Sequence, residues 1–183
     1  MVREIKEATE EQLELRGYDQ MKAAIVYYSM QGNSELVAGK IADRLGADII
    51  RIEPDKAYPD KGAMKFFWGG KSAVMGEMPR LKPYEFDPDK YDVIIIGFPV
   101  WAGRPAPPVR TFVEEFKERL RGKRLAAFAC QSGNGAEKAF SRLKDQIGID
   151  SFAAELILID PKTKADSSND DKINSFCEII LFS

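Results

Sequence analysis

Short apolar runs alternate with amphipathic stretches from residue 22 to the end of the chain. The apolar runs are rich in β-forming residues and predict strands at 23–28, 48–52, 93–98, 125–130 and 154–159. Apolar residues at helical spacing predict helices within 36–45, 112–120, 140–147 and 173–181. The run at 93–98 is apolar on both faces, which is typical of a central parallel strand. This alternation predicts an α/β fold, a doubly wound five-stranded parallel sheet with helices on both faces.

Two segments lie outside this alternation. Residues 1–20 have a short apolar helical face and predict an N-terminal helical extension, ahead of a single domain at 21–183. An insertion at about 54–90 contains five prolines and the pair Gly69-Gly70, which interrupts a continuous helix. We expect this insertion to add a helix at the sheet edge, and a binding segment is the alternative.

The composition narrows the functional classes. The 183 residues include 27 basic and 29 acidic side chains, a balance that argues against binding to nucleic acid or to an anionic membrane. Because the chain contains no histidine, imidazole-based catalysis and histidine-rich metal sites are excluded. No apolar run approaches the roughly 18 residues that span a bilayer, and the first residues lack the apolar core of a signal peptide. We therefore expect a cytoplasmic protein without a metal site. Its two cysteines, Cys130 and Cys177, are expected to be reduced, and one long-range disulfide is the alternative.

The segment 29–34 follows the first predicted strand and runs directly into a helix. Its hydroxyls, amides and glycine stand at a helix N-terminus, which favours an anion, and Gly32 lets the backbone approach a ligand closely. A Walker A loop and a dinucleotide-binding fingerprint are both absent. The alternative is an ordinary helix cap by Asn33 or Ser34.

Two further loops follow the predicted strands at 93–98 and 125–130, and the three loops should meet at one edge of the sheet. The first of these carries Trp101 among prolines, which suits stacking on a flat ligand, and a tryptophan that fills the core is the alternative. The second, at 130–135, is a glycine-rich turn with exposed backbone N–H groups. An anion cradle, an aromatic platform and a backbone-rich turn predict a phosphorylated planar cofactor.

In these segments the sequence resembles the flavodoxin family. The family's first motif is matched from the first strand into the following helix by Ile25, Val26, Tyr27, Ser29, Gly32, Ser34, Ala38 and Ile41. Ser34 stands where the family usually has threonine and keeps the hydroxyl. The later segments resemble flavodoxins with a long insertion before the third strand, and the resemblance covers roughly residues 22–181.

The resemblance implies FMN as the cofactor. It places the FMN phosphate on Ser29, Gln31, Gly32, Asn33 and Ser34. It places the flavin ring between two groups, Pro99, Val100, Trp101, Ala102 and Gly103 on one side and Ser132, Gly133, Asn134 and Gly135 on the other. The stacking residue is expected to be Trp101. Because the two ring loops contain Arg104 and no acidic residue, we expect a less negative potential for the reduced flavin than in acid-ringed flavodoxins.

Two functions follow from such a site. In an electron carrier that docks with redox partner proteins, the flavin does the chemistry and no catalytic side chain is needed. In an FMN-dependent NAD(P)H oxidoreductase, the flavin passes a hydride to a quinone or a similar acceptor. The sequence favours the carrier and leaves the enzyme as the alternative.

Overall fold

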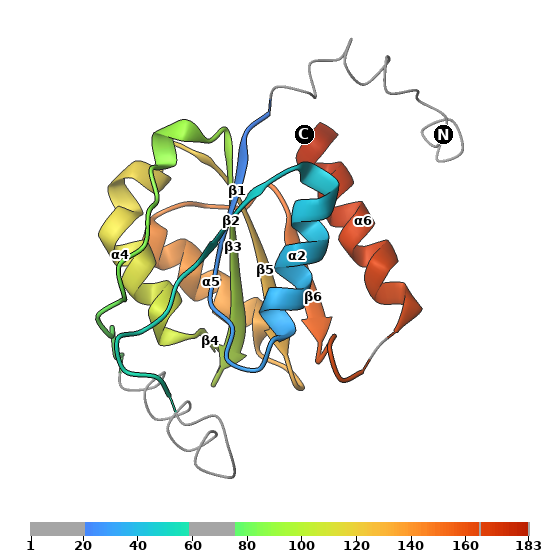
Figure 1. Ribbon diagram of the computed structural model, residues 1–183, viewed down its shortest axis with the longest axis horizontal. Helices are drawn as coiled ribbons and strands as arrows, with labels where there is room; N and C mark the ends of the chain where they lie inside the picture. Colours follow the sequence, from blue (N-terminus) through green and yellow to red (C-terminus); the bar gives the residue numbers. More distant parts are fainter. Residues whose placement is uncertain (1–20, 59–75, 165, 183) are drawn as a thin grey trace.

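The computed structural model describes residues 21–58, 76–164 and 166–182 (Figure 1). The strands are β1 Ala23–Tyr27, β2 Asp48–Arg51, β3 Val93–Trp101, β4 Arg104–Pro105, β5 Arg124–Gln131 and β6 Glu155–Ile159. The helices are α2 Asn33–Leu45, α4 Pro107–Leu120, α5 Ala136–Ile147 and α6 Ser167–Phe182, with a 3-10 turn, η3, at Pro88–Lys90. None of these helices is long and apolar enough to cross a membrane, judged over the described residues.

The five long strands form one parallel sheet in the order β2-β1-β3-β5-β6. This order is the flavodoxin-like form of the doubly wound sheet. The expected five-stranded parallel sheet is therefore confirmed. The short strand β4 was not expected, and it pairs antiparallel with the end of β3.

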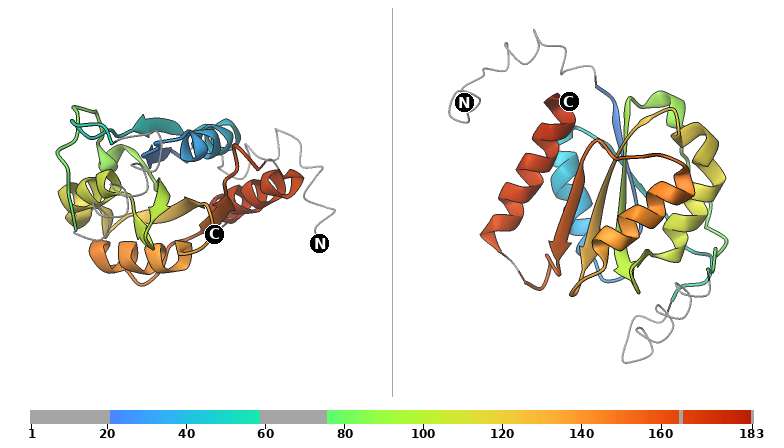
Figure 2. Two further views of the ribbon diagram at one scale, coloured as in Figure 1. Left: turned by 90° about the horizontal axis from the view of Figure 1, so that it is seen from below. Right: turned by 180° about the vertical axis from the view of Figure 1, so that it is seen from behind.

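Helices cover both faces of the sheet because its central strands are apolar on both faces (Figure 2). Val26 and Ile96 face α4 and α5, in one apolar cluster with Phe112 and Phe140. The alternate residues of the same strands face α2 and α6, in a second cluster that includes Ile25, Ile95, Ile41 and Phe176. Successive side chains of a strand point to opposite faces, so one apolar run supplies both cores.

The end of β3 differs from the sequence-based expectation. The strand was expected to end at Phe98 but continues to Trp101, and it returns through a tight turn into β4. The two turn residues, Ala102 and Gly103, have φ angles of 50° and 65°, as the favoured two-residue hairpins require. Alanine is an uncommon residue in this conformation, so the sequence carries no clear hairpin signal. Of the prolines expected in a loop, Pro107 and Pro108 instead begin α4, where a missing N–H costs nothing, and Pro99 and Pro105 lie in β3 and β4.

In the described parts of the insertion, two stretches of the chain lie side by side and are hydrogen-bonded to each other. Asp55 N–H donates to the Arg80 carbonyl (2.9 Å), and Lys82 N–H donates to the Glu53 carbonyl (2.8 Å). The Thr111 hydroxyl of α4 also donates to the Pro79 carbonyl (2.8 Å). The first two bonds join the two ends of the insertion to each other, and the third ties the second end to α4. Of the insertion at about 54–90, which was expected to add a helix, residues 59–75 lie outside the described residues, as does the N-terminal extension at 1–20.

Candidate functional site

A cavity of about 270 Å³ lies at the carboxyl edge of the sheet, beyond the ends of β1, β3 and β5. From β1 the chain continues to β2 on one side, and from β3 it continues to β5 on the other. Parallel sheets bind ligands at such a switch point. The lining residues are Ser29, Met30, Gln31, Asn33, Ser34, Pro99, Val100, Trp101, Ala102, Cys130, Gln131, Ser132, Gly133, Asn134 and Asp160.

The structure brings together eleven of the fourteen residues that the sequence placed in a site. The three others are Gly32, Gly103 and Gly135, which all have positive φ angles and shape the loops without lining the cavity. A Cβ on Gly135 would lie 3.1 Å from the Cα of Gly103. The missing side chains therefore let the β3–β4 turn and the β5–α5 loop approach within backbone contact.

One end of the cavity, here called the cradle, is the segment 29–34 between β1 and α2. Gly32 N–H donates to the Ser29 hydroxyl (3.1 Å), and this local hydrogen bond closes a turn in the segment. The cap residue of α2 is Gly32, with φ 88°, and among the described residues no side chain caps the first N–H groups of the helix. The alternative of a helix cap by Asn33 or Ser34 is therefore wrong. The positive end of α2 is left without a side-chain acceptor, which suits an anion.

Ser34 supplies the strongest chemical feature of the cradle. Its side chain is only 1% exposed, and its Oγ is buried with no hydrogen-bond partner among the described residues. The Cys130 thiol lies close enough for the Ser34 hydroxyl to act on the pKa of the thiol, but a protonated thiol is only a weak hydrogen-bond partner. A buried hydroxyl without a partner costs about 1–3 kcal/mol, so its place in the cavity wall calls for a polar ligand.

The other end, here called the platform, consists of residues 99–102 at the end of β3 and 132–134 after β5. Trp101 is half-buried and meets Tyr28 and Tyr58 edge to face, with ring centroids 5.9 and 5.2 Å apart. Trp101 therefore packs on the core and also lines the cavity, so the two predicted roles, stacking on a ligand and filling the core, are compatible. Ala102 and residues 132–134 are exposed, which places the cavity mouth at the platform.

The site predicted from the sequence lacked four of the lining residues, Met30, Cys130, Gln131 and Asp160. Asp160 comes from a fourth loop, after β6. The signal for it was present in the chain, because the carboxyl end of the last strand must lie at the same edge as the others. Gln131 continues β5, and its side-chain oxygen accepts from Ala136 N–H (2.9 Å) at the start of α5.

The titratable groups of the cavity are held in single protonation states near neutral pH. Burial raises the pKa of the Cys130 thiol to about 12, so the thiol stays protonated. Burial also acts to raise the pKa of Asp160, but a hydrogen bond from Ser132 (2.7 Å) and the Lys164 ammonium (3.0 Å) outweigh it and hold this pKa below its usual range. Within the described residues, no cluster of three or more cysteine or acidic side chains could bind a metal ion.

Comparison with known proteins identifies the family. The family model for flavodoxin matches residues 22–170, which is most of the chain. The chain belongs to the flavodoxin family. The match covers the cradle, the platform and Asp160, so all four loops of the cavity lie within the flavodoxin domain. No curated protein matches the sequence.

Solved structures show the same fold at low sequence identity. A flavoprotein from Lactobacillus acidophilus, solved in complex with FMN, is 20% identical with a TM-score of 0.67, over 85% of this chain and 98% of that one. A putative flavoprotein from Bacteroides eggerthii is 21% identical with a TM-score of 0.69, over 88% and 99% of the two chains. The two-electron reduced flavodoxin of Megasphaera elsdenii is 16% identical with a TM-score of 0.58, over 88% and 99%. This flavodoxin therefore shares its fold with structures from several bacteria.

Proposed function

We propose that this flavodoxin-family protein binds FMN in the cavity and transfers electrons between redox partners. The observation that carries the proposal is the unpartnered, buried Ser34 hydroxyl beside the N-terminus of α2. A phosphate monoester would give that hydroxyl and the free helix N–H groups an acceptor. The FMN bound by the similar flavoprotein of L. acidophilus supports this choice of ligand.

The shape of the cavity favours a flavin that is buried at one end and accessible at the other. Ser29 and Ser34 in the cradle are buried, whereas Ala102 and Ser132 at the platform are exposed. A phosphate in the cradle would leave the ring at the mouth, beside Trp101. When bound, FMN supplies reversible one- and two-electron transfer, and the protein supplies binding and electrostatics.

The residues that line the cavity favour a carrier over an enzyme with its own acid or base. The Cys130 thiol is protonated and buried, and Asp160 is an ionised carboxylate that is bonded to Ser132 and Lys164. Neither group is poised to exchange a proton with a substrate near neutral pH. An electron carrier needs no such group.

An FMN-dependent NAD(P)H oxidoreductase remains the second proposal, because cationic side chains surround the β3–β4 turn. Arg142 donates to the Gly103 carbonyl (2.8 Å), and a Cβ on Gly103 would lie 3.3 Å from Lys138 Cδ. Burial lowers the pKa of Arg110, and the charges of Arg104 and Arg142 lower it further, so these three guanidinium groups contribute to one region of positive charge. Such a cluster suits the phosphates of a nicotinamide dinucleotide or an acidic surface on a partner protein.

Anaerobic mixing with a nicotinamide cofactor separates the two proposals. The purified protein, loaded with FMN, is mixed with NADH or NADPH under nitrogen while the flavin absorbance is followed. We expect no fast bleaching, but full bleaching by dithionite in the control. Fast bleaching by either nucleotide would overturn the carrier in favour of the oxidoreductase, and a protein that cannot be loaded with FMN would overturn both.

A further inference from the structure

The turn after β6 joins the two ends of the cavity. The Ser132 hydroxyl of the platform donates to Asp160 Oδ1 (2.7 Å). Two residues later, Lys162 N–H donates to the side-chain oxygen of Asn33 in the cradle (2.9 Å). Thr163 and Lys164 N–H groups both donate to the Asp160 carbonyl, which closes the turn on itself. The backbone of Lys162 is thus held beside the cradle by bonds that do not involve its own side chain.

The Lys162 side chain lies across Gly32. A Cβ on Gly32 would be 2.6 Å from Lys162 Nζ, 3.2 Å from Cδ and 3.4 Å from Cε. Any larger residue at this position would push the lysine away. Glycine at position 32 therefore allows the left-handed backbone, with φ 88°. It also leaves room for the Lys162 ammonium group to lie over the cradle.

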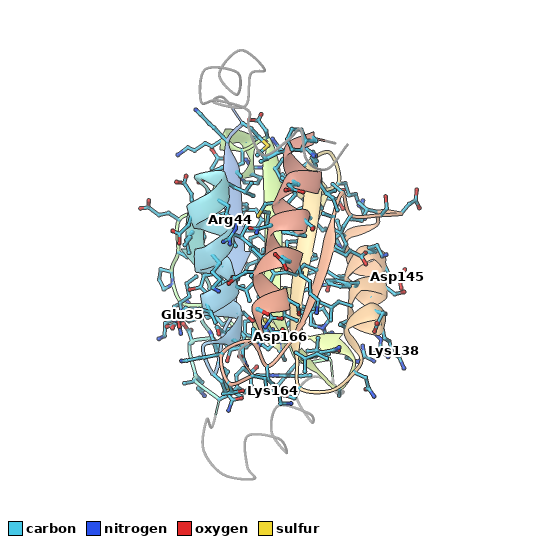
Figure 3. The ribbon with its side chains drawn as sticks, turned by 90° about the vertical axis from the view of Figure 1, so that its right-hand side faces the viewer. Glu35, Arg44, Lys138, Asp145, Lys164 and Asp166 are labelled. Carbon is cyan, nitrogen blue, oxygen red and sulfur yellow. The ribbon has the colours of Figure 1, made fainter. Side chains whose placement is uncertain are left out.

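The charge of Lys162 is not balanced by any of the residues that the structure describes. Within residues 21–58, 76–164 and 166–182, no ion pair is formed by its exposed ammonium group. Its neighbour Lys164 is paired with Asp160, and Arg51 on the other side of the cradle is paired with Glu35 (2.8 Å). Figure 3 shows Lys164 and Glu35 at the same lower end of the molecule, where the strands end. The positive end of α2 also lies at Gly32, so an unpaired cation there is unfavourable until an anion binds.

We propose that Lys162 is a phosphate-binding residue that makes the site select a phosphorylated flavin over an unphosphorylated one. This inference rests on the proposed function, since it assumes that the phosphate of FMN occupies the cradle. The buried, unpartnered Ser34 hydroxyl is the independent observation that points to an anion at that place. Lys162 adds a full positive charge to a cradle that otherwise offers only hydroxyl and N–H donors.

The test compares FMN with riboflavin, which has the same ring but no phosphate. The full-length protein is freed of flavin, and dissociation constants for both ligands are measured by fluorescence titration at low and high salt. In Lys162→Gln we expect the FMN dissociation constant to rise roughly fivefold to tenfold, between the effects of an exposed ion pair and of a charge-assisted hydrogen bond. Riboflavin binding should not change. The salt dependence of FMN binding should weaken, because an exposed charge is screened.

Two further variants make the result specific. Lys162→Arg keeps the charge and should retain most of the preference for FMN. Lys172→Gln removes the same charge from an exposed lysine on α6 that, unlike Lys162, does not lie over Gly32, and it should leave both dissociation constants unchanged. An equal loss of FMN and riboflavin binding in Lys162→Gln would overturn the inference, because it would show a structural role for the side chain. Unchanged FMN binding would also overturn it. A wild-type protein that binds neither flavin would instead overturn the proposed function.

Discussion

The cradle and the platform line the same cavity but are built from different arrangements of sequence segments. The cradle is one continuous segment, 29–34, whose bend is closed by a local hydrogen bond from Gly32 to Ser29. The platform is assembled from the end of β3 and the β5–α5 loop, and Asp160 after β6 is bonded to it, so its parts are brought together by contacts between distant residues. In the cradle Ser29 and Ser34 are buried and only Gln31 is exposed, whereas Ala102 and residues 132–134 of the platform are exposed. Substitutions in the cradle should therefore affect which ligand binds, and those in the platform should affect the ring and its potential.

The largest effect is expected at Gly32. In Gly32→Val, a β-branched residue must adopt φ 88° and its Cβ meets Lys162 Nζ at 2.6 Å. We expect the protein to lose about 1–2 kcal/mol of its free energy of unfolding and to lose FMN on purification. The flavin content of the purified protein and its urea unfolding curve measure the two effects.

Gly46→Val is the matched control for this substitution. Gly46 also has positive φ, at 62°, but nothing lies within 4 Å of the position of its Cβ, at the far end of α2. The loss of stability should be similar, and FMN should be retained. If both variants lose FMN, instability alone would explain the loss and the cradle would not be shown to hold the phosphate.

The difference between the cradle and the platform also explains which features of the molecule could be predicted from the sequence. The alternation of strands with helices depends on local patterns such as the apolar run before Ser29, and its prediction is confirmed except for the length of β3 and the presence of β4. The cradle follows from the same local pattern, and its role in binding stays a prediction. The platform depends on the turn at Ala102 and Gly103 and on the loop that brings Asp160 to Ser132. Neither feature has a local signature, because alanine is not a typical turn residue and the Asp160 contact spans 28 positions of the chain.

A smaller effect is expected at Ser34, where a substitution should weaken FMN binding without lowering the stability of the flavin-free protein. Ser34→Ala removes a buried hydroxyl that has no partner, so the flavin-free protein should be as stable as wild type or slightly more stable. The FMN dissociation constant should rise about 10- to 150-fold, because a hydrogen bond to a charged group is worth roughly 1.5–3 kcal/mol. Riboflavin binding should not change. Thermal unfolding without flavin and titration with both ligands measure these quantities.

Thr111→Val provides the contrast, because the buried Thr111 hydroxyl does have a partner, the Pro79 carbonyl at 2.8 Å. This variant should lose about 1 kcal/mol of stability and bind FMN as wild type does. A clear loss of stability in flavin-free Ser34→Ala would mean that the hydroxyl is satisfied within the protein, and the main evidence for an anion in the cradle would be lost.

At the platform, Trp101→Ala should weaken FMN and riboflavin equally. Stacking contributes about 0.5–1.5 kcal/mol beyond area burial, which corresponds to a twofold to twelvefold rise in both dissociation constants. Because stacking quenches flavin emission, the bound flavin should also become brighter. Trp101→Phe keeps a ring and should restore most of the quenching. Unchanged emission in Trp101→Ala would leave Trp101 only its packing against Tyr28 and Tyr58.

The smallest effect concerns charge at the cavity, because Asp160, from the loop after β6, lines it beside the two ring loops that contain no acidic residue. Asp160 lines the cavity and is ionised, but it is paired with Lys164 at 3.0 Å. The pair is nearly neutral, so each partner can be removed to give opposite shifts of the flavin potential. A single charge about 10 Å from the ring shifts a one-electron potential by roughly 20–70 mV, for effective dielectric constants between 80 and 20.

Asp160→Asn should therefore make the potential of the bound flavin less negative, because it removes a negative charge and leaves Lys164 unbalanced. Asparagine can still accept the hydrogen bond from Ser132, so the loop should keep its place. Lys164→Gln should make the potential more negative by a similar amount, and both shifts should shrink at high salt, since Lys164 is largely exposed. Potentiometric titration of the two variants measures the shifts. Shifts of the same sign would mean that the substitutions act through the shape of the loop, and no shift in either would place the pair too far from the ring for its charges to matter.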